Sequence, residues 1–382
     1  MHRLILFLTS MLSACAITPP QVDVVTPPPL VNGSVFTPIE VEPESDIFAL
    51  SSQQKSQFLD YMQKAKANGI RDDKALYSYI ERMLGNFTYD GATYTATESL
   101  QYKKGNCITL AVLVQAYADI IGLDTDYQLI TEAPVFAGHN DVILLSSHFR
   151  TKIYAPKNED SEAIVMLRSG IIIDYFPSNS GVISGSATRN DLIAKYYANH
   201  GADALLIGDI DAGLSYVQQA LSFNPTSLEL LNTAAVLHRR VGDYATAKSM
   251  YEYILKENAE HAVALSNFGV LAKAMGDTPL AARIEAQLNT INSNDPFHLL
   301  HLAQNSAQQG KFNKASDYIL QAREIAPYLP QTYVEMALLN YERGRLEPAI
   351  KELQSALELT RSHQDRQRYE SKYKALQAMT KH

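Results

Sequence analysis

Five glycines in the C-terminal half of the chain recur at intervals of 34 residues. They are Gly208, Gly242, Gly276, Gly310 and Gly344. Seven positions before each glycine, and five and twelve positions after it, the sequence carries only Gly, Ala, Ile or Leu. Small apolar residues at fixed offsets let paired helices approach closely, and each pair must stack on the next to bury its apolar face. The period therefore predicts an all-helical solenoid.

This pattern resembles the tetratricopeptide repeat, whose period is also about 34 residues. Five repeats fit between about residues 194 and 363, and Pro225 and Pro327 close two of them. The polar segment Ser362–Lys381 is suited to cap the open end of the stack. We therefore expect an all-α tetratricopeptide solenoid over residues 191–382, with a concave groove that binds a protein or peptide partner.

The groove of this solenoid is assigned by the same resemblance. It would be lined by Asn232, Arg239, Ser266, Lys273 and Gln304. The alternative is a solenoid that binds no partner and only stabilises the domain before it. The sequence leaves both interpretations open.

Residues 105–123 form a nearly continuous apolar segment that contains Cys107. A helix that is apolar on every side is buried, so we expect a central helix that ends at Gly122 in the left-handed conformation. Cys107 follows a Gly-Asn pair at the start of this helix, where free backbone N–H groups and the helix dipole favour a thiolate. We therefore expect a lowered pKa for Cys107. The alternative is that Cys107 is a small buried hydrophobic residue, as free cysteines usually are.

Helical patterns precede this segment and strand-like patterns follow it within residues 46–190. Ser51 and Asp72 stand at the start of two helical patterns, and Thr95 with Glu98 resembles a capping box. The strand-like runs span residues 127–131, 141–145, 149–154, 163–167 and 171–176. Helices first and an antiparallel sheet second predict an α+β domain in which the sheet wraps the central helix.

A cysteine at a helix start needs a base, and the base needs a group that orients it. His139 stands at the head of one predicted strand and Asp174 at the end of another, in the order Cys, His, Asp. The Gly-Asn-Cys helix start, the strand-borne His and the Asp followed by aromatic residues and Pro resemble the transglutaminase-like cysteine hydrolases, which have a papain-like architecture. This resemblance implies Cys107 as nucleophile, His139 as general base and Asp174 as the residue that holds the imidazole in its working tautomer.

Alternatives to single members of this triad stay open. His148 is a second candidate for the base, and Asp141 is a candidate for the orienting carboxylate only if its strand bends. Gln101 and Tyr102 are candidates for a second oxyanion donor beside the backbone N–H of the cysteine. The acidic run at 159–162 lacks the spaced loop of a calcium site, and we expect no metal or cofactor.

Residues 1–15 resemble a lipoprotein signal peptide. His2 and Arg3 precede a short apolar run, and Leu12–Cys15 resembles the lipobox of bacterial lipoproteins, in which the cysteine is lipidated and becomes the new N-terminus. The alternative is a plain secretory signal. Ala16 resembles an outer-membrane sorting signal, so we expect a chain anchored in the outer membrane at Cys15 and facing the periplasm. Residues 16–45 hold seven prolines and predict a semi-extended tether.

The chain has 33 Lys and Arg and 41 Asp and Glu, and its formal net charge is -8. This balance argues against a nucleic-acid binder, because no excess of positive charge is available to neutralise phosphates. Together these features predict an envelope lipoprotein that is a thiol acyl-transfer enzyme, either a protease or amidase or a transglutaminase. Its repeats would bind a protein partner or substrate. The alternative is a non-catalytic tetratricopeptide lipoprotein that acts as an adaptor or assembly factor in the envelope.

Overall fold

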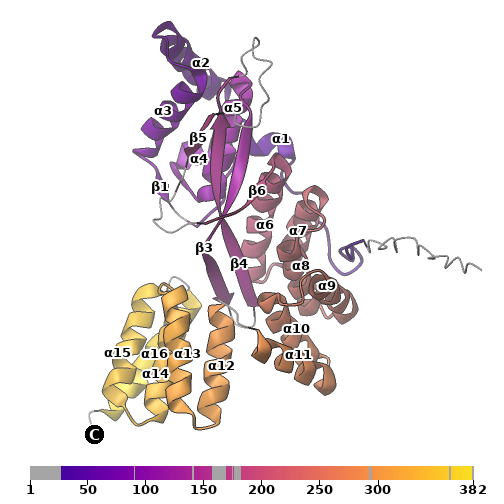
Figure 1. Cartoon of the computed structure of the whole chain (residues 1–382), viewed down its shortest axis with the longest axis vertical. Coiled ribbons are helices and arrows are strands. Elements are labelled where there is room, and N and C mark those ends of the chain that lie inside the picture. The colour runs from indigo at the N-terminus through magenta and orange to yellow at the C-terminus, as the bar shows by residue number, and fades with distance from the viewer. Residues whose placement is uncertain are drawn as a thin grey trace, which may run out of the picture.

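The computed structural model describes residues 27–89, 91–139, 142–156, 169–173, 175, 182–291, 295–360 and 363–380. In these ranges an N-terminal part of helices and a sheet precedes a C-terminal array of helices (Figure 1). None of the described helices is long and apolar enough to cross a membrane.

The N-terminal helices begin at capping residues that the sequence marks. They are α1 (Glu44–Ile47), α2 (Ser52–Ala67), α3 (Asp72–Leu84), α4 (Ala96–Tyr102) and α5 (Cys107–Ile121). Ser51 and Gln54 form a capping box at α2, and Thr95 and Glu98 form the predicted one at α4. Helix α5 ends at Gly122 in the left-handed conformation, as predicted. A short parallel pair, β1 (Thr88–Tyr89) and β2 (Lys104–Gly105), lies between these helices in the sequence.

A four-stranded sheet follows α5. Its strands are β3 (Thr125–His139), β4 (Val142–Tyr154), β5 (Gly170–Ile173) and β6 (Val182–Ala187), in the spatial order β5-β4-β3-β6. All three pairings are antiparallel. The strand predicted at 163–167 lies outside the described residues, and β6 was not predicted from the sequence. The antiparallel sheet agrees with the prediction, but the runs predicted as separate strands at 141–145 and 149–154 belong to the one strand β4, and β3 is much longer than the run that marked it.

Helix α5 is the centre of the N-terminal core. Its residues from Ile108 to Ala118 are buried, and α5 packs against β4, α3 and α4. Phe58 and Tyr79 place their rings against that of Tyr117, so α2 and α3 cover one side of α5. The prediction of a buried central helix beside the sheet is confirmed. The same core includes Tyr196 and Tyr197 of the next helix, so it continues into the repeats.

The C-terminal helices form five antiparallel pairs and a last single helix. The pairs are α6 (Arg189–Ile207) with α7 (Ile210–Phe223), α8 (Leu228–Arg240) with α9 (Tyr244–Glu257), α10 (Ala262–Ala274) with α11 (Thr278–Thr290), α12 (Pro296–Gln308) with α13 (Phe312–Ile325), and α14 (Pro330–Glu342) with α15 (Leu346–Leu359). Helix α16 (His363–Met379) packs on α15. This is the tetratricopeptide-like repeat fold that the period of 34 predicted.

The recurring glycines end the first helix of every pair. Gly208, Gly242, Gly276, Gly310 and Gly344 have φ between 70° and 83°, a backbone conformation that residues with a Cβ avoid. No heavy atom would lie within 4 Å of a Cβ at any of them, so the conformation and not the space selects glycine. Asp209, Asp243 and Asp277 follow three of these glycines and cap the second helix with their carboxylates.

Successive first helices of the repeats lie close to one another. Helix α6 contacts α8, α8 contacts α10, α10 contacts α12, and α12 contacts α14. Most second helices pack instead on both first helices that flank them in the chain, as α9 does on α8 and α10, whereas α11 packs mainly on α10. First helices therefore line the inner side of the curve. The apolar core is divided along this array: one cluster extends from α6 to α11, another from α12 to α14, and a third from α14 to α16.

Residues 27–43, which we call the strap, depart from the predicted tether because they dock on the repeats. Val31, Val35 and Phe36 join the apolar cluster of α6 to α11. The backbone N–H of Thr37 donates to Asp211, and that of Ile39 donates to Ser215 (2.9 and 3.0 Å). Burial of apolar side chains and paired backbone groups explain why this proline-rich segment is bound rather than free.

Candidate functional site

Cys107 is the first residue of α5, and the residue as a whole is half-buried. Asn106 caps the helix by accepting the backbone N–H of Thr109 at 3.0 Å. Its amide group also donates to Thr93, which accepts a second bond from Asn199 of α6 (2.7 and 2.8 Å). A Cβ at Gly105 would meet the side chain of Thr109 at 2.5 Å, so glycine is required at this turn. The turn that carries Cys107 is therefore rigidly held.

The environment of Cys107 raises its pKa, which makes the prediction of a lowered pKa wrong. Burial is the largest cause, because the thiolate is a charged form that a desolvated site disfavours. Several groups near the thiol lower its pKa: the backbone N–H groups of Phe149, Ile108 and Cys107, and the positive charge of Lys195. Together they lower the pKa less than burial raises it. The helix start is where it was predicted, but β4 covers it.

The structure does not bring the backbone of His139 to Cys107. His139 is the last residue of β3 and pairs with Val142, whereas the residue of β4 beside the thiol is Phe149. At about 3.3 Å per residue, Phe149 is roughly 23 Å along β4 from Val142. The backbone of His148 directly precedes Phe149 and pairs with Ile130. The side chains of both histidines lie outside the described residues.

The other triad candidates fall outside the described residues as well. Asp174 follows Ile173, which pairs with Thr151 two residues from Phe149, and Asp174 itself is not described. Asp141 and the acidic run at 159–162 are not described either. Cys15 and the signal segment precede the first described residue. The Cys107, His139 and Asp174 triad therefore stays a prediction. Among the described residues, no three His, Cys, Asp or Glu side chains are grouped as a metal site requires.

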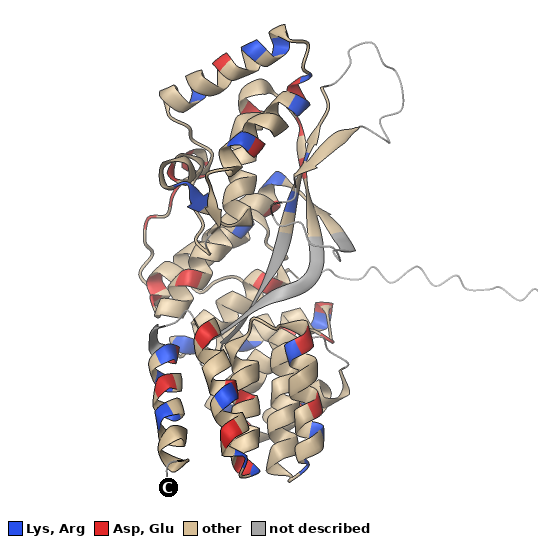
Figure 2. Cartoon of the chain, turned by 90° about the vertical axis from the view of Figure 1, so that its left-hand side faces the viewer, with Lys and Arg blue, Asp and Glu red and all other residues tan. Residues whose placement is uncertain are grey.

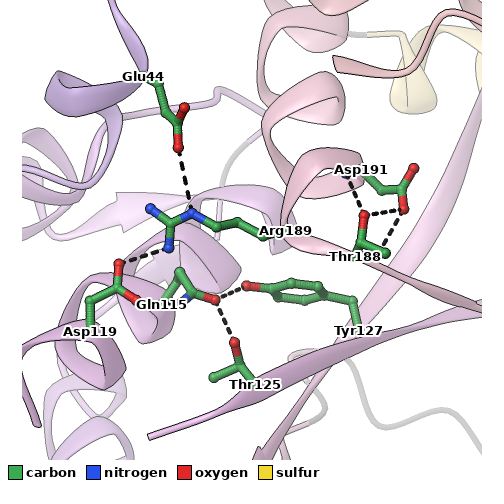
Figure 3. A network of polar contacts seen from close by, with 8 residues as sticks. All are labelled: Glu44, Gln115, Asp119, Thr125, Tyr127, Thr188, Arg189 and Asp191. Atoms are coloured by element: carbon green, nitrogen blue, oxygen red, sulfur yellow. Dashed lines mark hydrogen bonds and ion pairs between the residues drawn. The ribbon is translucent and has the colours of Figure 1, made fainter. Parts of the chain in front are cut away.

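A network of polar side chains fixes α5 to the sheet and to the repeats (Figure 3). Gln115 of α5 accepts hydrogen bonds from the hydroxyls of Thr125 and Tyr127 of β3. Arg189, the first residue of α6, pairs with Asp119 of α5 at 2.7 Å and with Glu44 of α1 at 3.5 Å. These contacts hold the N-terminal part and the first repeat in one arrangement.

The predicted groove is closed at the second repeat. Asn232 of α8 is only 4% exposed, and its side-chain oxygen accepts a hydrogen bond from Asn267 of α10 at 3.0 Å. Val236, one turn further on α8, is fully buried. Strand β4 contacts both α8 and α10, so the chain itself covers this part of the inner face. The assignment of Asn232 to an open groove is wrong for this reason.

The remaining predicted groove residues differ in exposure. Arg239 and Ser266 are half-buried, and Lys273 is exposed at the last turn of α10. Gln304 of α12 is exposed and donates to Glu335 of α14 at 2.9 Å. The inner face is therefore open toward α12 and α14.

Two exposed residues of α14 extend this open face, and the sequence interpretation missed both. Leu338 and Tyr341 are 38% and 44% exposed and lie three residues apart on one helix, so their side chains are neighbours. Leu338 stands 34 residues after Gln304, and Tyr341 stands twice that interval after Lys273. Extending Gln304 by one period and Lys273 by two periods would have identified them. We call Gln304, Leu338 and Tyr341 the inner-face patch.

The charges of the described helices are mixed in sign. Figure 2 shows acidic and basic residues interspersed along the repeat helices in that view, without a wholly basic helix. Arg323 pairs with Glu352 at 2.7 Å, and Lys195 pairs with Glu229. Such pairing leaves little excess positive charge for phosphates.

Comparisons with known proteins give likenesses of fold at low identity. No protein-family model and no curated protein matches the chain. A thermophilic tetratricopeptide protein of Thermus thermophilus is 20% identical, with 48% of this chain and 99% of that chain covered and a TM-score of 0.39. Yeast Tom70 is 13% identical (50% and 41% covered, TM-score 0.40), and pilF of Pseudomonas aeruginosa is 17% identical (49% and 90% covered, TM-score 0.35). At these values the roles of those proteins have no bearing on this chain.

Proposed function

We propose that this chain is a protein-binding adaptor and that its binding surface is the inner-face patch. The observation that supports this proposal is the exposure of Leu338 and Tyr341 on the inner side of the array, while the equivalent region of α8 is closed by the chain itself. Tyrosine is enriched among the residues that carry most of the binding energy of protein interfaces, and the leucine beside it adds apolar area that a partner can bury. Gln304 and Glu335 add hydrogen-bonding groups at the margin.

The partner that fits this patch is an extended or helical peptide segment with apolar or aromatic side chains. A photo-crosslinking residue at position 341, with one at position 320 as the control, identifies the segment in cells. Leu320 is 46% exposed on α13, a second helix, and so lies away from the inner side. The purified segment is then titrated against the wild type and the variants.

Tyr341→Ala is expected to weaken binding at least tenfold, because a tyrosine anchor contributes about 2 kcal/mol or more. Leu338→Ala is expected to weaken binding severalfold, because it removes only part of the buried apolar area. Leu320→Ala should change the affinity less than twofold. Equal crosslinking from positions 341 and 320, or an affinity that none of the three variants changes, would contradict the proposal.

We also propose that the adaptor is lipid-anchored through Cys15 and lies at the outer membrane on its periplasmic side. The basis is the Leu12–Cys15 motif at the end of a signal-like segment, followed by Ala16. Mass spectrometry of the mature N-terminus tests this anchor directly. An acylated Cys15 supports it, and an intact or unmodified N-terminal segment excludes it.

A second candidate function is thiol acyl transfer by a transglutaminase-like domain over residues 46–190. The observation that favours it is the position of Cys107 at a helix start, beside backbone N–H groups that could stabilise an oxyanion. In that reaction the thiolate attacks an amide carbonyl, an amine leaves, and water or another amine resolves the thioester. The raised pKa of Cys107 weighs against it.

A further inference from the structure

Three exposed apolar residues occupy the same position in the first three repeats, directly before the left-handed glycine. Ile207, Val241 and Met275 are 81%, 36% and 37% exposed. Each stands at the turn between the first and second helix of its repeat, so stacked repeats present them along one edge of the array. Leu30 of the strap is 84% exposed. We call these four residues the turn edge.

The strap begins at this edge. The backbone N–H of Asn32 donates to His238 at 3.4 Å, and its side chain donates to Asp243 at 2.8 Å. His238 and Asp243 flank Val241, so Leu30, two residues before Asn32, belongs to the same region. The strap then reaches Asp211 at the first turn of α7 through the backbone of Thr37. The described part of the strap therefore begins at the turn edge and continues from there along the repeats.

The length of that segment limits how far the turn edge can lie from Cys15. Residues 16–26 separate Cys15 from Pro27. A fully extended chain covers at most about 3.5 Å per residue, so the two ends of this segment are at most about 40 Å apart. If Cys15 carries the acyl chains of the proposed anchor, on which this inference rests, Pro27 is held within about 40 Å of the bilayer, three residues from Leu30 of the turn edge.

We propose that the turn edge contacts the lipid surface of the membrane that holds Cys15. The acidic residues of this edge do not prevent such a contact, because Asp209, Asp243 and Asp277 each accept a backbone N–H at the start of a helix (3.1, 3.2 and 3.0 Å). Their negative charge is thereby offset by the positive end of the helix dipole. The contact is made by apolar side chains at the level of the headgroups and does not need anionic lipid.

The test uses the lipidated full-length protein in phosphatidylcholine vesicles. Ile207→Cys and Met275→Cys, each in a Cys107→Ser background, carry an environment-sensitive fluorophore at the turn edge. Leu320→Cys carries it on α13 as the control, since Leu320 is also exposed. The sulfur of Cys15 is blocked by the lipid group attached to it, so each protein has one reactive thiol. Iodide quenching is compared before and after delipidation, and mass spectrometry verifies Cys15 in the same samples.

We expect iodide quenching at positions 207 and 275 to fall at least threefold in vesicles, with a blue-shifted emission, and quenching at position 320 to stay unchanged. Addition of anionic lipid should not alter this. Equal quenching at 207, 275 and 320 in a protein with acylated Cys15 overturns the contact and leaves the anchor intact. An unacylated Cys15 overturns both. Protection that persists in delipidated protein without vesicles indicates a protein contact or a second copy at the edge and also overturns the proposal.

Discussion

Asn32 and Asp243 are 211 residues apart in the sequence, and a hydrogen bond of 2.8 Å joins their side chains. The same Asp243 lies 3.3 Å from His238, whose other ring nitrogen accepts the backbone N–H of Asn32. Three residues thus fasten the strap to the second repeat. This contact determines where the N-terminal segment leaves the repeats.

Loss of the Asn32 side chain should loosen the strap. Asn32→Ala removes the hydrogen bond to Asp243, worth about 1 kcal/mol, together with the two that Ser34 donates to the side-chain oxygen of Asn32. Amide exchange at Thr37 and Ile39 should therefore accelerate at least about fivefold. Hydrogen-exchange mass spectrometry of residues 31–39 measures this. Ser56→Ala on the exposed side of α2 is the control and should leave the exchange unchanged. An Asn32→Ala protein with wild-type exchange would show that the bond does not hold the strap.

Acid should release the same contact. Burial lowers the pKa of His238 below its ordinary value near 6.5, so the folded chain favours the neutral ring while the unfolded chain binds a proton more readily. The stability that depends on neutral His238 is therefore present above about pH 6.5 and is lost as the pH falls below it. Exchange of residues 31–39 should be faster at pH 5.5 than at pH 7.5, after correction for intrinsic rates.

His238→Gln provides the control for that pH dependence. Glutamine cannot titrate, yet its oxygen can accept from Asn32 and its amide group can donate toward Asp243. The variant should keep slow exchange at both pH values. If its pH dependence equals that of the wild type, another buried histidine controls the strap. His200 is the first to examine, since it stacks on Tyr216, whose hydroxyl donates to the strap residue Glu42.

His298 is predicted to be a destabilising residue of the fourth repeat. It is 1% exposed, and neither of its ring nitrogens has a hydrogen-bond partner among the residues that the structure describes. A buried polar group without a partner costs about 1 to 3 kcal/mol, and the equivalent residues Leu230 and Ala264 are apolar. His298→Leu should raise the free energy of unfolding by about 1 kcal/mol, and by more at pH 5.5 because burial lowers the pKa of His298. Urea denaturation at the two pH values gives this difference, and a destabilised variant would refute the assignment.

The two kinds of repeat glycine should respond oppositely to alanine. Gly276→Ala forces a residue with a Cβ to φ 70° and should cost about 1 to 2 kcal/mol. Gly269→Ala, within α10, should be neutral or stabilise by up to about 1 kcal/mol, since its Cβ would meet Ile284 at an ordinary 3.7 Å. Thermal unfolding of both variants beside the wild type separates them. Equal destabilisation would contradict the assignment of the left-handed conformation as the cause that selects glycine at position 276.

The repeats could be predicted from the sequence because the same residues that end and begin helices recur in one repeat after another. A left-handed glycine such as Gly242, followed by a capping Asp243, acts within a few residues of the chain and recurs every 34 positions. The strap could not be predicted in this way. Its contacts join residues about 200 positions apart and follow no period, and its prolines are equally typical of a free tether.

The same distinction applies to the candidate sites. The start of α5 at Cys107 is a local feature and was predicted, whereas its pKa depends on how closely β4 covers the thiol, which is a tertiary property. Asn232 was assigned to the groove from its repeat position, but burial between α8, α10 and β4 is particular to this chain. Tyr341 could have been predicted as a groove residue from the sequence, since it stands at the repeat position of Lys273.

The alkylation rate of Cys107 as a function of pH tests most directly whether the chain acts by binding or by thiol chemistry. A protein that starts after Cys15 has one thiol, so the rate reports Cys107 alone. We predict slow alkylation at neutral pH that rises only above the ordinary thiol pKa of about 8.5, with no change in His139→Ala, His148→Ala or Asp174→Ala. Fast alkylation that persists well below pH 8.5 and is lost in one of the histidine variants would contradict this account and establish a reactive thiolate and imidazolium pair.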